Sequence, residues 1–140
     1  METEAIPACV FTDPEVAHVG LTEAEAREQH GDKIQIYRHA FADVDRAIAE
    51  GEPLGFIKAV CDPKGQILGA HILGPQAGDL IQPLVLAMKE KMPIARISQT
   101  IHAYPTLVEI NRRAADQYYR EKLFSGWMGK FLRGWVRWLS

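Results

Sequence analysis

The sequence has little cysteine, no marked excess of either charge and no long apolar run. Its 140 residues include two cysteines, Cys9 and Cys61, and carry a formal net charge of −2. Two widely separated cysteines exclude a disulfide scaffold and a CxxC-type redox or zinc pair, and they favour a reduced, cytoplasmic chain. A charge so near neutral argues against a nucleic-acid partner. No run approaches the roughly 20 apolar residues of a membrane span, and the start METEAIP is not typical of a signal peptide.

The common cofactor and nucleophile motifs are also missing. The sequence has no GxGxxG after a strand and no GxxxxGK, so we expect no dinucleotide or phosphate cradle within this chain. No serine occurs in the elbow context of a nucleophile. We expect no metal site, because most of the histidines stand alone, far apart in the sequence: His18, His30, His39 and His71. The residue types alone do not describe a complete enzyme.

The pattern that is present predicts an α+β domain, with a mostly antiparallel sheet and helices packed on it. The clearest strands are Leu54–Cys61 and Gln66–Leu73, and the turn sequence Asp62-Pro63-Lys64-Gly65 between them predicts a hairpin. Shorter strand-like segments precede this hairpin: Ala8–Thr12, Val16–Gly20 and Ile34–Arg38.

Four helices are predicted from caps and periodicity. Thr22 and Glu25 form a capping box before a helix over Glu23–His30, and Gly31 stands at its end. A helix over Ala77–Lys91 contains Pro83, which predicts a bend or a late start. A short helix over Ile94–Thr100 and a long one over Thr106–Leu123 follow.

The last segment differs in composition, which predicts a domain over residues 1–120 and a separate helical unit over 121–140. From Arg120 to Ser140, five basic residues oppose Glu121 alone, and all three tryptophans lie there. Lys130, Arg133 and Arg137 fall opposite an apolar stripe, so the helix is amphipathic and basic. Three surfaces remain open as its partner: its own domain in a dimer, other domains of the same protein, or an anionic membrane. The stripe comprises Phe124, Trp127, Met128, Phe131, Trp135, Trp138 and Leu139.

The segment Ile101–Glu109, IHAYPTLVE, is the most unusual stretch of the chain. The Tyr104–Pro105 bond is a candidate for the cis form. Two interpretations remain open. In the first, Thr106 and Glu109 form a capping box and Tyr104 is a packed aromatic. In the second, the loop carries a function.

Four stretches, taken together, resemble one family. They are VFTDPEVA with VGLTE after it, GFIK, ILGAHILG and the segment from His102 to Glu109. In this order and spacing, over about residues 7–120, the chain is similar to the dimerisation (interface) domain at the C-terminus of the pyridine nucleotide-disulfide oxidoreductases. Within that family, mercuric reductase-like and dihydrolipoamide dehydrogenase-like flavoenzymes are closest in motif. The last 20 residues are not covered.

The resemblance implies a site. The family motif His-x-His-Pro-Thr-x-x-Glu supplies an acid/base pair to the partner subunit's disulfide and flavin. Its second histidine corresponds to Tyr104 and its glutamate to Glu109, so these are the implied catalytic residues across the dimer, while His102, Tyr104 and Pro105 would approach the partner's flavin. A tyrosine, with a pKa near 10, cannot serve as the neutral-pH base. This departure favours the mercuric reductase branch over glutathione or lipoamide turnover.

The resemblance also implies partners and cofactors outside the chain. The family binds FAD and NAD(P) in two preceding domains, and neither these domains nor their CxxxxC occur here. We therefore expect a fragment that forms a homodimer, binds no cofactor and catalyses nothing alone. Two alternatives remain: a purely structural dimerisation module, and a membrane-peripheral module that uses the basic helix.

Overall fold

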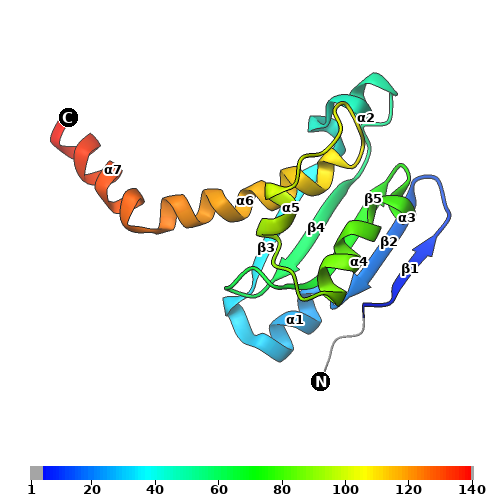
Figure 1. Cartoon of the computed structure of the whole chain (residues 1–140), viewed down its shortest axis with the longest axis horizontal. Helices are drawn as coiled ribbons and strands as arrows, with labels where there is room; N and C mark the ends of the chain where they lie inside the picture. The colour runs from blue at the N-terminus through cyan, green and yellow to red at the C-terminus, as the bar shows by residue number, and fades with distance from the viewer. Residues whose placement is uncertain (1–4, 140) are drawn as a thin grey trace.

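A five-stranded antiparallel sheet forms the centre of the protein (Figure 1). The computed structural model describes residues 5–139, except for the side chains of Trp127 and Met128. The strand order is β1-β2-β5-β4-β3, and every neighbouring pair is antiparallel. The predicted α+β class is confirmed. The strands are β1 (Pro7–Val10), β2 (Glu15–Gly20), β3 (Gln35–Ala40), β4 (Phe56–Cys61) and β5 (Ile67–Gly74).

The predicted hairpin joins β4 to β5. The Asp62 carboxylate accepts hydrogen bonds from the backbone N–H groups of Lys64, at 2.8 Å, and Gln66, at 2.9 Å. Gly65 takes a positive φ of 84° in the turn, a conformation that costs glycine least. The turn chemistry visible in the sequence therefore determines this connection locally.

Helices cover one face of the sheet. α3 (Ala77–Leu80) packs on β2 and β5, α4 (Gln82–Lys89) packs on β5, and α6 (Glu109–Ser125) packs on β3 and β4 beside α5 (Ala95–Gln99) (Figure 1). Burial of apolar side chains between these layers forms the main core. Its largest fully buried members include Tyr37, Phe41, Ile57, Ile72, Ile81, Leu84 and Ile110.

The helix predicted over Ala77–Lys91 is divided in two. α3 ends at Leu80, and α4 starts at Gln82 with Pro83 in its first turn. Proline lacks an N–H group and is tolerated where that group would have no helical partner. The predicted late start is confirmed.

The capping box before α1 (Glu23–His30) is also confirmed. The Glu25 backbone N–H donates to the Thr22 hydroxyl at 3.2 Å, and the Thr22 backbone N–H donates to the Glu25 carboxylate at 2.8 Å. On the face of the sheet opposite the main core, Ala26 of α1 packs with Ile34 and Val60 in a small second core. α1 therefore covers one end of the sheet.

The long helix does not begin as predicted. A capping box of Thr106 and Glu109 was one interpretation, and it is wrong: α6 starts at Glu109 after Val108, with no side-chain cap. The Thr106 hydroxyl donates instead to the Ala103 carbonyl at 2.6 Å. The hydroxyl that would have capped the helix is therefore bonded to the loop backbone instead.

α6 continues to Ser125, across the boundary predicted after residue 120, and α7 (Trp127–Leu139) follows Gly126. The division at residue 120 therefore stays a prediction. Across residues 5–139, no helix combines the length and apolar character needed to cross a membrane. The remaining short elements are 3-10 turns, Gly31–Lys33 and Phe41–Asp43, and α2 (Asp45–Ala49).

Candidate functional site

The loop between α5 and α6, residues 100–108, lies beside α2 at one end of the sheet (Figure 1). The Tyr104–Pro105 peptide bond is cis, as the sequence predicts, and Asp13–Pro14 is a second cis bond that was not predicted. Two large side chains of the loop face outward: Ile101 is 97% exposed and Tyr104 is 66% exposed. The loop therefore presents Tyr104 at the protein surface rather than packing it in a core.

The Tyr104 hydroxyl donates a hydrogen bond to the carboxylate of Asp45, the first residue of α2. This bond, and the negative charge of Asp45, raise the pKa of Tyr104 above its ordinary value. Tyr104 therefore stays protonated at neutral pH. Sequence reasoning missed Asp45, because it lies in a polar, irregular stretch with no motif around it.

Glu109 is buried, with 5% of its surface exposed, at the start of α6. One carboxylate oxygen, Oε1, lies 3.4 Å from the Arg113 guanidinium. The other, Oε2, is buried and has no hydrogen-bond partner. The charge of Glu109 raises the pKa of Tyr104 and that of Arg113 lowers it, so the structure brings these three groups into one electrostatic site.

Two further buried polar atoms adjoin the loop. His102 Nδ1, in the loop itself, has no hydrogen-bond partner. Asn111, on the first turn of α6, donates from Nδ2 to the Leu80 carbonyl at 2.9 Å, while its Oδ1 has no partner. Buried polar atoms without partners are uncommon, and each asks for an explanation. Here they belong to residues of the loop and of the first turn of α6.

His39, on β3, is a half-buried group that the sequence did not single out for this site. Burial lowers the pKa of His39, and the charges of Arg113 and Arg120 lower it further. The backbone hydrogen bond and the charge of Asp43 oppose this by raising it. Its Nε2 atom is buried without a hydrogen-bond partner. His39 is therefore a neutral imidazole under α6, and only the tertiary structure shows it.

A groove of about 320 Å³ runs beside the loop. Two of its lining side chains, Arg46 and Glu50, are joined in an ion pair at 2.6 Å. No glycine-rich phosphate cradle occurs in the sequence. Pro105, expected near a flavin, lines this groove together with Gln76, Leu80, Thr106, Leu107 and Val108.

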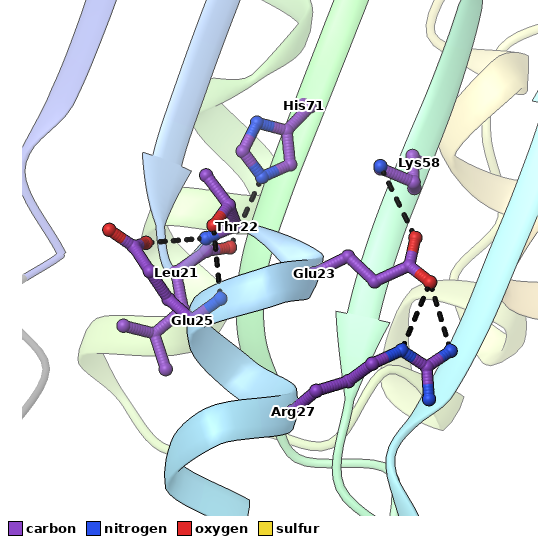
Figure 2. Close-up of polar contacts among 7 residues, drawn as sticks. All are labelled: Leu21, Thr22, Glu23, Glu25, Arg27, Lys58 and His71. Atoms are coloured by element: carbon purple, nitrogen blue, oxygen red, sulfur yellow. Dashed lines mark hydrogen bonds and ion pairs between the residues drawn. The ribbon is translucent and has the colours of Figure 1, made fainter. Parts of the chain in front are cut away.

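A second polar cluster joins α1 to the open face of the sheet (Figure 2). Glu23 lies between Lys58 on β4, at 3.4 Å, and Arg27, at 2.9 Å. His71 Nε2 on β5 lies 3.1 Å from the Leu21 carbonyl, just before the capping box. These contacts hold the helix to the sheet, and we assign them a structural role.

Neither cysteine forms a redox pair. Cys9 and Cys61 are both free thiols. Burial is the main cause that raises the pKa of each thiol, and Cys61 is fully buried. The charges of Glu15 and Asp79 raise the pKa of Cys9 further. Both are therefore thiols rather than reactive thiolates at neutral pH.

The fold and the exposed loop define a single α+β domain with an antiparallel sheet covered by helices on one face. Comparison with known proteins identifies its family. Residues 6–115 match the model of the pyridine nucleotide-disulphide oxidoreductase dimerisation domain. The chain belongs to this family and is its dimerisation domain, as the sequence motifs predicted.

The relatives are reductases and dehydrogenases. The chain is 45% identical over 113 residues to dihydrolipoyl dehydrogenase of Geobacillus stearothermophilus, covering 80% of this chain and 24% of that protein. The Bacillus subtilis dihydrolipoyl dehydrogenase is 44% identical over 112 residues, with 79% and 24% covered. Among solved structures, the Cu(II) complex of the HOCl-induced flavoprotein disulfide reductase RclA from Escherichia coli matches with a TM-score of 0.77 and 26% identity, over 83% of this chain and 26% of that one. The chain thus spans about a quarter of the length of the curated relatives it matches.

Proposed function

We propose that this domain belongs to an FAD- and NAD(P)-dependent reductase, in which two copies form a homodimer. In that enzyme the loop at Tyr104 of one copy lies at the active site of the other. The chain alone carries no catalysis, because the redox disulfide and both cofactors belong to other parts of the enzyme. The two free thiols suit a reducing compartment, so we further propose a cytoplasmic enzyme.

The observation that carries this proposal is the exposure of Tyr104 beside the buried Glu109. A packed structural tyrosine would be covered by its own chain, whereas this one is 66% exposed on a loop fixed by Asp45. Glu109 is only 5% exposed, so it would not contact the partner subunit directly. It would act on Tyr104 through its charge, which raises the pKa of Tyr104. Tyr104 is then the catalytic contact, and Glu109 is a positioning residue.

The protonated state of Tyr104 favours one class of electron acceptor. A tyrosine whose pKa is raised by Asp45 donates a hydrogen bond but does not accept a proton near neutral pH. Dithiol–disulfide exchange depends on such proton transfer, since the thiolate is the reacting form. We therefore propose a metal ion, as in the mercuric reductase-like branch, ahead of lipoamide. The dihydrolipoyl dehydrogenase names of the relatives support the alternative.

The homodimer has support in the outward faces of the helices. Leu86 on α4 and Tyr119 and Leu123 on α6 are exposed apolar or aromatic side chains. Exposed apolar side chains on the outer faces of helices are typical of surfaces that a second copy covers. Light scattering of the chain at micromolar concentration should show a dimer, and Leu86→Glu combined with Leu123→Glu should shift it toward monomer. Leu54→Glu, in an exposed loop, is the matched control. A wild-type chain that is monomeric throughout would contradict the proposal.

The experiment that tests the site uses the full enzyme. Tyr104→Phe keeps the ring and removes the hydroxyl, so turnover with mercuric ion should fall at least about tenfold. Tyr104→His restores the family's residue, and it should raise turnover with lipoamide. If both variants retain wild-type rates with both acceptors, Tyr104 is structural and the domain serves only to dimerise.

A further inference from the structure

α7 carries a continuous apolar face that the rest of the chain leaves exposed. The helix runs from Trp127 to Leu139 and projects beyond the sheet, on the far side of α6 (Figure 1). Among the large side chains of α7 that the structure describes, Trp138 is the most exposed, at 81%. Exposed apolar faces of this extent mark interaction surfaces. The face comprises Phe131, Leu132, Trp135, Val136, Trp138 and Leu139.

The opposite side of α7 is basic. At 3.6 residues per turn, Lys130, Arg133 and Arg137 fall within one narrow arc, away from the tryptophans. The helix contains no acidic residue, although the chain as a whole has a net charge of −2. A partner that meets both sides of this helix therefore combines an apolar surface with negative charge.

The junction with α6 holds α7 in this position. Gly129 is buried against the preceding helix, and a Cβ added there would lie 2.0 Å from the Phe124 carbonyl oxygen. A groove of about 380 Å³ runs along the junction, lined by Phe124, Leu132 and Val136 with Arg133 and Arg137 at its edge. An apolar groove with guanidinium groups beside it suits a lipid acyl chain that carries an anionic headgroup.

We propose that α7 docks this protein on an anionic membrane surface, lying in the plane of the interface. Tryptophans at the boundary between headgroups and acyl chains, with lysine and arginine toward the phosphates, are the features of interfacial helices. Thirteen residues make a helix of about 20 Å, too short to cross a bilayer. A second copy of α7 is the poorer partner, because it could cover the apolar face but offers no negative charge to the basic side.

The three tryptophans of the protein provide a specific probe. All of them lie in α7, so the intrinsic tryptophan fluorescence of the full chain reports this helix alone. Vesicles of phosphatidylcholine with a minority of phosphatidylglycerol should shift the emission to shorter wavelength and should carry the chain with them in flotation. Vesicles of phosphatidylcholine alone should bind at least about tenfold more weakly. Salt at about 1 M, where charges are screened beyond ~3 Å, should weaken the binding to anionic vesicles.

Charge variants separate the helix from the rest of the chain. Lys130→Glu with Arg133→Glu should lower the affinity for anionic vesicles at least about tenfold. Lys89→Glu with Arg96→Glu, on exposed positions of α4 and α5, changes the net charge equally and should bind as the wild type does. Lys130→Arg with Arg133→Lys conserves the charge and should also bind normally, which shows that binding depends on charge rather than on the individual side chains. Circular dichroism should show the same helix content in all three variants, so that the loss of binding is not a failure to fold.

Two results would overturn the proposal. One is emission and flotation that do not respond to anionic vesicles. The other is a tryptophan shift that depends on protein concentration and occurs without vesicles, because this would show that a second copy covers α7. Both readouts are independent of the redox activity proposed above, so either proposal can fail while the other stands.

Discussion

The Tyr104 hydroxyl and the Asp45 carboxylate are joined by a hydrogen bond across 59 residues of sequence. One partner belongs to the loop before α6, and the other begins α2. The bond links the segment that resembles the family's catalytic motif to a residue outside every recognised motif. It also raises the pKa of Tyr104, because a nearby carboxylate disfavours the phenolate.

Replacing Asp45 by asparagine should lower the pKa of Tyr104 toward the ordinary value of 10.0. The contribution of this raised pKa to the stability of the fold is fully present below about pH 10, the pKa of an unfolded tyrosine. It is lost as the pH rises through the folded-state pKa of Tyr104. The phenolate absorbance of the chain, compared with that of Tyr104→Phe, measures the titration of this one residue. Asp32→Asn, at an exposed carboxylate of the 3-10 turn Gly31–Lys33, is the control and should leave the titration of Tyr104 unchanged. An equal pKa in the Asp45→Asn chain would contradict the assignment.

Glu109→Gln should destabilise the domain by about 1–2 kcal/mol, because it removes the charge of a buried carboxylate paired with the half-exposed Arg113. Urea unfolding of the chain measures this cost, with the exposed Glu90→Gln as a control. In the full enzyme the same variant should also reduce turnover. A variant that unfolds earlier but turns over normally would show that Glu109 only stabilises the fold.

Two double-mutant cycles should distinguish the real capping box from the apparent one. Thr22→Ala should cost about 1 kcal/mol, and it should couple to Glu25→Ala because each side chain bonds the other's backbone. Thr106→Ala and Glu109→Ala should show no capping-box coupling, since Thr106 donates to Ala103. Chemical unfolding of the four single and two double variants provides both coupling energies. Equal coupling in the two pairs would contradict the observed start of α6.

His71 should make the domain less stable in mild acid. Burial lowers its pKa, with the charges of Lys58 and His18 acting alongside, although the bond to the Leu21 carbonyl opposes this. As the pH falls below about 6.5, the unfolded chain protonates first and stability is lost. His71→Gln should therefore lose less stability than the wild type between about pH 7.5 and 5, whereas His30→Gln, at an exposed position, should follow the wild type. Parallel pH profiles for all three chains would refute the prediction.

Local chemistry in the sequence was enough to predict several features of the fold. The turn at Asp62, the capping box at Thr22 and the late helix start at Pro83 each depend on atoms within a few residues. The cis bond at Tyr104–Pro105 was likewise indicated by its residue pair. The family motifs, read in order, predicted the dimerisation domain.

The start of α6 shows where local reasoning failed. The Thr-x-x-Glu pattern is the same at Thr22 and at Thr106, but only Thr22 caps a helix. At the second position the loop turns back on itself, and the Ala103 carbonyl accepts the hydroxyl hydrogen. The packing of α6 on β3 and β4 places Glu109 in a buried position, where its carboxylate meets Arg113.

The sequence by itself determined the family, the hairpin, the first capping box and the amphipathic character of α7, because each is encoded in neighbouring residues or in a helical period. Only the tertiary structure decided that Asp45 holds Tyr104, that Glu109 is buried and that His39 lies neutral beneath α6. These contacts join segments that the strand order β1-β2-β5-β4-β3 and the covering helices bring together. That arrangement results from burying the apolar faces of sheet and helices jointly, a property of the whole chain that no short pattern contains.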